Sequence, residues 1–271
     1  MTRRTRSAAW MTAAPLAVLV AAVALPAAAH MPFLLPNYFS VTDRDHVTVD
    51  AGFTETAFAS DIALKSEQFH MLAPDGSRVR LAPVFSVRDK TVLEAALPTR
   101  GTYRLSTGLR LGRLGRMARV KDAWVVLGEG NASPPAGATS VVPVQSVTTS
   151  ETYVTRGAPT ATVLAPTGSG VELHPLTHPS ELFVTDGFAF ELLHDGKPLA
   201  NQRLELFLGH QVPGSHKPLT SVTTDAAGKA RLDFSQPGLF MLMTRHRGPA
   251  PAGAATPWRS HTYTLTFEVM P

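Results

Sequence analysis

The chain has 271 residues, of which 44% are hydrophobic, and it contains no cysteine. The lack of cysteine excludes disulfide bonds, thiolate metal sites, a lipid anchor on cysteine and cysteine catalysis. The formal net charge is +4, but three arginines lie within the first six residues. The remainder of the chain therefore carries little net charge, which removes the main compositional support for nucleic-acid binding.

The chain begins with the pattern of a secretory signal peptide. The early arginines form a basic region, an apolar stretch follows over residues 13–25, and Ala27–Ala29 fits the small-x-small rule of signal peptidase. We therefore expect residues 1–29 to be removed after Ala29, and the mature protein to be exported, most simply to the periplasm. No later apolar run approaches ~20 residues, so we expect no membrane span in the mature chain.

Cleavage at this place would make His30 the first residue of the mature protein. An N-terminal histidine offers a metal two nitrogens, its α-amine and its imidazole, which titrate near ~7.7–8.0 and ~6.5. Such a nitrogen chelate suits Cu(II) or Ni(II) in tetragonal geometry. The alternative is that the peptidase rules merely leave an arbitrary residue at this position.

The mature sequence has the pattern of short β-strands throughout, and no segment of ten or more residues has a convincing helical period with caps. Turn signals such as Asp75-Gly76, Asp195-Gly196 and the segment 225–228 separate the apolar–polar alternations. We therefore predict an all-β protein built of β-sandwiches. The clearest predicted strands are 46–51, 77–81, 102–106, 203–208 and 262–269.

A weak internal repeat indicates two modules. Residues 101–107 and 238–244 both read Gly-x-aromatic-x-Leu-x-Thr, and each follows a turn and a strand. We interpret each repeat as a hairpin whose second strand sends its aromatic residue and leucine to one face. The predicted domains are β-sandwiches at 30–127 and 170–271, joined by a linker and connecting strands at 128–169, where Gly-, Pro- and Ala-rich stretches lie.

Histidine is the obvious candidate metal ligand in a chain with ten histidines and no cysteine. Besides His30, the candidates are His178 in a proline-flanked loop, His246 between two arginines after an apolar strand, and His261 at the start of the last strand. Each of them could equally be an ordinary solvated residue. We expect His194 to occupy a surface position beside a strand.

Two further patterns leave alternatives open. Four arginines recur at every third residue from Arg110 to Arg119, which indicates either an anion-binding loop or an exposed loop or edge strand. Met31, Met241 and Met243 raise the option of a thioether copper site, although methionines on such a strand usually fill the core. The motifs of hydrolases, zinc proteases, phosphate loops and dinucleotide binding are missing, so we expect no enzymatic activity.

Four segments, in this order, resemble the NikM-like periplasmic family, which is classified as domain of unknown function 4198 and associated with nickel or cobalt uptake. They are the Ala-His start with Phe33–Pro36, residues 170–179, residues 192–200 with 224–228, and the closing strand 263–269. The resemblance implies two β-sandwich domains, the second similar to a transthyretin-like or carboxypeptidase-regulatory-like module. It also implies a non-enzymatic role in metal handling, with His30 as a ligand.

The leading hypothesis is a periplasmic protein that binds Ni²⁺, Co²⁺ or Cu²⁺ and assists an inner- or outer-membrane uptake system. In this hypothesis His30 supplies amine and imidazole, and one or two of His178, His246 and His261 complete the site. Two alternatives stay open: a β-sandwich adaptor that binds no metal, and a copper oxidase in which His30 forms half of a histidine brace.

Overall fold

The computed structural model describes residues 30–128, 132–209 and 217–271, so the predicted signal peptide, residues 1–29, lies outside the described residues. The described chain confirms the all-β prediction. It contains three sheets of five, eleven and four strands and a short 3-10 turn, η1 (Thr162–Leu164). Among the described residues, no helix has the length and hydrophobicity needed to cross a membrane.

The three sheets divide the strands as follows. The five-stranded sheet contains β1 (Met31–Pro36), β3 (His46–Thr54), β4 (Ile62–Ala63), β7 (Val84–Ser86) and β8 (Thr91–Ala96). The four-stranded sheet contains β13 (Val171–Pro175), β14 (Phe188–His194), β15 (Lys197–Pro198) and β18 (Lys229–Leu232). The eleven-stranded sheet contains β2 (Ser40–Val41), β5 (His70–Leu72), β6 (Arg78–Arg80), β9 (Gly101–Ser106), β10 (Arg110–Val120), β11 (Ala123–Gly128), β12 (Ala138–Arg156), β16 (Arg203–Leu208), β17 (Thr220–Thr223), β19 (Gly238–Pro249) and β20 (Trp258–Val269).

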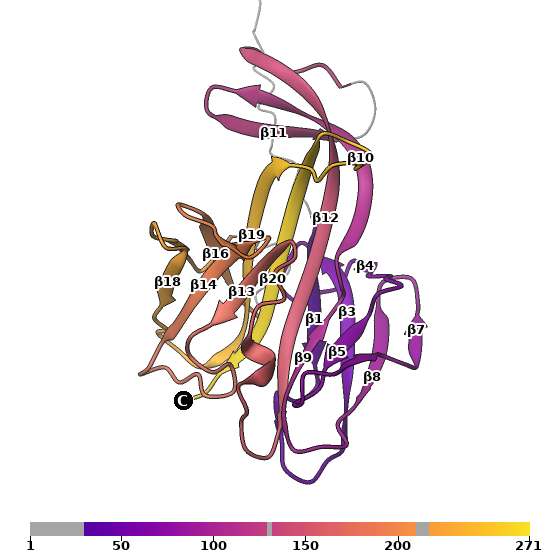
Figure 1. The fold of residues 1–271 in the computed structure, drawn as a ribbon, viewed down its shortest axis with the longest axis vertical. Helices are drawn as coiled ribbons and strands as arrows, with labels where there is room; N and C mark the ends of the chain where they lie inside the picture. Colours follow the sequence, from indigo (N-terminus) through magenta and orange to yellow (C-terminus); the bar gives the residue numbers. More distant parts are fainter. Residues whose placement is uncertain (1–29, 129–131, 210–216) are drawn as a thin grey trace, which may run out of the picture.

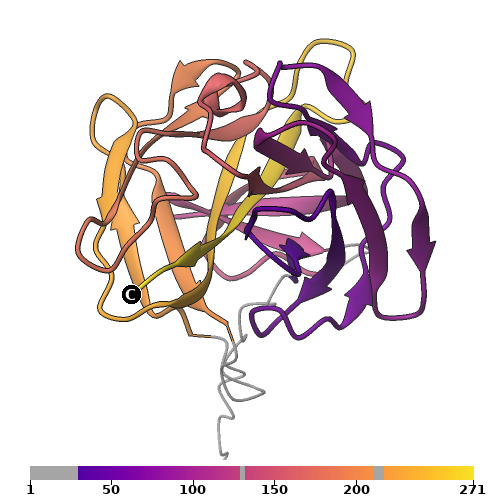
Figure 2. The ribbon, with the colours of Figure 1, turned by 90° about the horizontal axis from the view of Figure 1, so that it is seen from below.

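The long sheet is shared by two sandwiches that lie side by side (Figures 1 and 2). In the first, the five-stranded sheet packs on β5 and β9 around a core that includes Leu34, Val49 and Tyr103. In the second, the four-stranded sheet packs on β16, β19 and β20 around a core that includes Phe190 and Phe267. Burial of these aromatic and aliphatic side chains supplies the main stabilising free energy, about 25 cal/mol per Å² of apolar surface.

Strand β12 joins the two sandwiches within one sheet. It pairs antiparallel with β9 of the first module and parallel with β20 of the second. The segment 128–169, predicted as linker and connecting strands, therefore contains β12, the strand at the centre of the molecule. The Pro- and Gly-rich stretch that follows β12 is irregular apart from η1, as its composition predicts.

The internal repeat corresponds to the strands β9 and β19. Tyr103 and Leu105 face the first core, and Phe240 and Leu242 face the second, as predicted from the alternation of each strand. The hairpin interpretation was wrong for both repeats. In the first, β5 lies between β6 and β9; in the second, β18 and β19 lie in different sheets.

The arginine-rich run is a strand. β10 pairs with β11 on one side and with β12 on the other, so the loop interpretation of Arg110–Arg119 was wrong. Together, β10, β11 and the first part of β12 form an arm that extends beyond the two sandwiches, beside the end of β19 and the start of β20 (Figure 1).

Candidate functional site

Three histidines cluster at one end of the second core. In β14, the core-facing residues Phe188, Phe190 and Leu192 lead to His194 at the next alternate position. In β19 the alternation leads in the same way to His246, and in β20 it leads to His261. Because side chains alternate across a strand, all three rings continue apolar stripes and point into the space between the two sheets.

The three rings are in direct contact. His246 and His261 lie directly opposite each other on β19 and β20, and the ring of His194 reaches both of them from the facing sheet. The ring centroid of His194 lies 4.7 Å from that of His246 and 5.1 Å from that of His261. The centroids of His246 and His261 are 6.4 Å apart.

A tight turn fixes His194 at the end of its strand. Asp195 and Gly196 both have positive φ, 50° and 73°, which is the conformation that a two-residue hairpin turn of type I′ requires. The turn pairs His194 with Lys197 on β15. It also places the carboxylate Oδ2 of Asp195 3.6 Å from Nε2 of His194.

Burial keeps two of the rings neutral. The pKa of His261 is lowered to about 4 by burial, with smaller effects of the same sign from His194, His246 and Arg259. The pKa of His246 is lowered to about 4 by burial and by His194. Asp195 opposes both shifts without reversing them. At neutral pH both rings are therefore unprotonated, which is the state that binds a metal.

The hydrogen bonds of Gln202 select a tautomer for His246. The side-chain amide nitrogen of Gln202 donates to Thr244 Oγ1 at 2.9 Å and to the carbonyl of Arg245 at 3.0 Å. Its amide oxygen therefore faces Nδ1 of His246, at a long 3.4 Å, and accepts the proton that Nδ1 carries. This leaves the lone pair on Nε2, and Gly248 keeps space beside that atom, since a Cβ there would lie 3.0 Å from it.

The spacing of the rings suits nitrogen ligation after a rearrangement. With metal–nitrogen bonds of ~2.0–2.1 Å, each ring centre lies ~3.2 Å from the metal, so ring centres are ~4.5–6.4 Å apart for angles of ~90–180°. The observed centroid separations fall within this range. As they stand, however, no three His, Asp or Glu side chains of the described segments are arranged to hold a metal ion, so the rings must turn before they converge on one ion.

His30 lies on the other face of the long sheet. The next residue, Met31, packs with Phe33, Met241 and Met243, and those two methionines share the face of β19 opposite to His246. Nε2 of His30 lies 3.7 Å from the carboxylate of Glu55 at the surface. The structure therefore does not bring His30 together with His246 and His261.

His178 lies in a third place, where the loop after β13 meets β9. Its Nδ1 accepts a hydrogen bond from the backbone N–H of Ser180 at 3.1 Å. Its Nε2 lies 3.2 Å from both Thr102 Oγ1 and the carbonyl of Thr160. Both ring nitrogens are therefore engaged, and the contact of Nε2 with Thr102 fastens this loop to the first module.

Sequence reasoning missed His194 in this cluster. The signal was the alternation Phe188, Phe190, Leu192, His194, which assigns the histidine to the core face once the strand is extended to its last residue. The adjacent Asp-Gly turn instead favoured a surface position, because turn residues are usually solvated.

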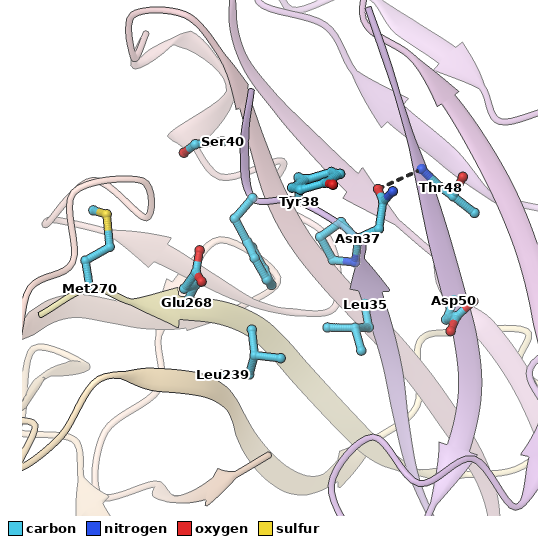
Figure 3. A pocket seen from close by; sticks show the side chains of 11 residues that line it. Leu35, Asn37, Tyr38, Ser40, Thr48, Asp50, Leu239, Glu268 and Met270 are labelled. Atoms are coloured by element: carbon cyan, nitrogen blue, oxygen red, sulfur yellow. Dashed lines mark hydrogen bonds between the residues drawn. The ribbon is translucent and has the colours of Figure 1, made fainter. Parts of the chain in front are cut away.

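A separate cleft of about 470 Å³ lies where β1 meets the start of β19 and the end of β20 (Figure 3). Tyr38, Asp50 and Glu268 line it with aliphatic side chains, and Asp50 accepts a hydrogen bond from Lys90 Nζ at 2.6 Å. None of the histidines of the cluster lines this cleft.

Comparison with known proteins gives one family and distant structural similarities. Residues 27–248 match the model of DUF4198, a domain of unknown function, and no curated protein matches the chain. The D0-D1 domain of Intimin is similar over 88% of this chain and 97% of that one, with 12% identity and a TM-score of 0.24. A DUF4785 family protein from Legionella pneumophila is similar over 78% of this chain and 50% of that one, with 10% identity and a TM-score of 0.24.

Proposed function

The chain belongs to the DUF4198 family, and we propose that it is an exported protein that binds a divalent transition-metal ion through His194, His246 and His261. The observation that carries the proposal is the contact of three imidazole rings, two of them with a pKa of about 4, at one end of a sandwich core. Because these rings need not release a proton at neutral pH, a metal ion binds there without competition from protons.

Imidazole ligation suits several metals. Nitrogen ligands bind divalent ions in the general order Co²⁺ < Ni²⁺ < Cu²⁺, so Cu²⁺ is the most sensitive probe of the site. The resemblance of the sequence to NikM-like proteins favours Ni²⁺ or Co²⁺ as the biological cargo, delivered to or received from a membrane uptake system. The proposal treats the second sandwich as a transthyretin-like module that carries this cargo and performs no catalysis.

His30 supplies a second, independent site in this proposal. If the signal peptide is removed after Ala29, the α-amine and imidazole of His30 form a chelate on the opposite side of the long sheet from the cluster. The carboxylate of Glu55 lies 3.7 Å from Nε2 of His30 and could add an oxygen ligand to that chelate. The two sites are separable by variants.

The experiment uses untagged protein that starts at His30, titrated with Cu²⁺ and with Ni²⁺ by isothermal calorimetry. The variants are His246→Gln and His261→Gln at the cluster, and His30→Gln, which removes the imidazole of the N-terminal chelate. His174→Gln is the matched control, because His174 lies in the same sandwich on β13 and contacts only a carboxylate, that of Glu191 at 3.6 Å.

We expect His246→Gln and His261→Gln each to weaken binding at one site by at least tenfold, and His174→Gln to have no effect. His30→Gln removes the N-terminal chelate and leaves the cluster intact. Binding that disappears only in His30→Gln would assign the metal to His30 alone. A wild-type protein that binds neither metal would overturn the proposed function.

A further inference from the structure

A pocket of about 480 Å³ lies beneath the arm, on the face of the long sheet opposite to the histidine cluster. One wall is formed by β19, β20 and β12, and the other by β10 and β11 of the arm. This volume is in the range of sites for small organic ligands, ~300–1,000 Å³. The pocket shares no residue with the cluster or with the site of His30.

The sheet wall is cationic and rich in hydroxyl groups. The register places Arg245 opposite Thr262 and Arg247 opposite Ser260, and Ser146 of β12 lies beside Ser260. Because His246 and His261 lie between these positions on their strands, strand alternation turns the arginines and hydroxyls to the opposite face. The sheet therefore carries histidines on one side and an arginine pair on the other.

The wall formed by the arm is mostly apolar. Val126 of β11 is 42% exposed, and its register with Met117 and Val142 places it on the same face as the pocket-lining Val144. Trp124 lines the same pocket, and its ring contacts that of Trp258, with 5.0 Å between centroids. Exposed apolar groups of this size around a cavity are typical of a surface that binds a partner or ligand.

The described lining of the pocket carries arginines and no carboxylate. Arg113 adds a third arginine from the arm, and no aspartate or glutamate is among the described lining residues. The Nε atom of Arg247 is buried and has no hydrogen-bond partner among the described residues, and burial lowers the pKa of its guanidinium. Glu205 acts on Arg245 from outside the lining. A buried guanidinium donor of this kind is stabilised by an anionic acceptor.

From this arrangement we propose that the pocket binds a small amphipathic carboxylate. Its charged group lies against Arg245, Arg247 and the hydroxyls of β20, and its apolar body lies against Val126 and Trp124. The combination of one cationic wall with one apolar wall selects for a ligand that has both an anionic end and a hydrocarbon part. Neither a simple anion nor a neutral hydrocarbon satisfies both walls.

The test is a fluorescence titration of the chain that starts at His30 with decanoate below its micelle concentration. Of the three tryptophans in the sequence, Trp10 precedes His30, so the signal comes from Trp124 and Trp258. Decan-1-ol serves as the neutral ligand of equal length, and acetate as the anion without an apolar body. The variants are Arg247→Gln and, on the opposite wall, Val126→Asp, each checked for native near-UV circular dichroism.

We expect decanoate to change the tryptophan emission saturably and to bind at least tenfold more tightly than decan-1-ol or acetate. Arg247→Gln should weaken decanoate binding about tenfold, which is 1.4 kcal/mol, and Val126→Asp should weaken it further by repelling the carboxylate. Arg80→Gln is the control, since Arg80 is 77% exposed on β6 of the other module. Equal affinities for decanoate and decan-1-ol would overturn the proposal, as would a Val126→Asp variant that binds decanoate normally.

A further experiment distinguishes a free ligand from a lipid surface. Sedimentation with phosphatidylglycerol vesicles, combined with no response to free decanoate, would assign the arm to membrane contact and would overturn the small-ligand site. Because the pocket and the histidine cluster share no residue, this result is independent of the metal titrations above.

Discussion

Two groups of buried polar side chains face the second sandwich, and they differ in how their charge is balanced. Arg104 on β9 is 2% exposed and donates to Glu151 at 2.7 Å, with Glu172 at 3.6 Å. Tyr263 on β20 donates to the same Glu151 at 2.9 Å. His261 lies two residues before Tyr263 on the same face of β20. Its ring contacts the rings of His194 and His246.

The comparison shows what each group can do. In the arginine network, one cation lies between two carboxylates, and Glu172 also accepts hydrogen bonds from Thr167 and Gly168, so the network fastens β9, β12 and the loop after β12 together. The histidine cluster gathers three bases of the same kind, and burial lowers the pKa of two of them. It therefore keeps lone pairs for an external cation, whereas the carboxylates of the arginine network already contact a cation of the protein.

The largest expected effect comes from breaking the arginine network. Arg104→Met removes the cation and leaves two buried carboxylates without compensation, so we expect the free energy of unfolding to fall by about 3–5 kcal/mol. Urea denaturation followed by circular dichroism measures this change. The triple variant Arg104→Met with Glu151→Gln and Glu172→Gln should recover part of the loss.

The control for this prediction is Arg80→Met. Arg80 and its partner Glu67 are 77% and 98% exposed and 3.9 Å apart, so no measurable change is expected there. An Arg104→Met protein as stable as the wild type would show that the network is dispensable.

The pH dependence of stability should come from the histidine cluster. The pKa values of His246 and His261 are about 4 in the folded protein and ~6.5 in the unfolded chain. The unfolded state therefore binds protons first as the pH falls, so stability is complete above pH ~6.5 and is lost progressively down to pH ~4. At 1.36 kcal/mol per pKa unit, the contribution of the well-buried His261 is on the order of 3 kcal/mol.

The measurement is the urea midpoint of metal-free protein between pH 4 and pH 7. His261→Gln should flatten this dependence, because glutamine does not titrate in the range, while His174→Gln should leave it unchanged. Equal slopes for the wild type and His261→Gln would mean that the cluster does not control acid stability.

Metal binding should raise the stability by a smaller amount. A ligand at one hundred times its Kd stabilises the folded state by about 2.7 kcal/mol. We expect this stabilisation to raise the melting temperature with Cu²⁺ at pH 7. The rise should be lost at pH 4, where protons compete for the rings. In His246→Gln the rise at pH 7 should be reduced, and if it is undiminished the copper is bound elsewhere.

The sequence predicted the positions of the strands better than it predicted which of their faces are buried. Alternation located β3, β9, β16 and β20 and placed Tyr103 and Leu105 on one face, which lies in the first core. Arg104 is on the other face of β9. That face is buried because one sheet serves both sandwiches, and no local pattern shows that a second sandwich covers it.

The same limit applies to the candidate site. His246 and His261 were candidates from their places beside strands, but their pairing depends on the register of β19 and β20, and the third ring depends on how β14 packs across the core. His30 carried more weight than His178 in the sequence, because its α-amine offers a second nitrogen, yet the long sheet separates His30 from the cluster and hydrogen bonds engage His178. These separations follow from the parallel pairing of β12 with β20, a contact between distant segments that no short motif encodes.

The smallest expected effect concerns His178 and sharpens the contrast between holding the fold and binding a metal. His178→Ala removes contacts with Thr160 and Ser180, each worth about 1 kcal/mol. We expect the free energy of unfolding to fall by about 1–2 kcal/mol and the affinity for Cu²⁺ and Ni²⁺ to stay unchanged, measured by urea denaturation and calorimetry on the same sample. A loss of metal affinity without a loss of stability would reverse the assignment and make His178 a ligand. The structure favours the first result, because both nitrogens of His178 contact the protein while Nε2 of His246 faces the space kept by Gly248.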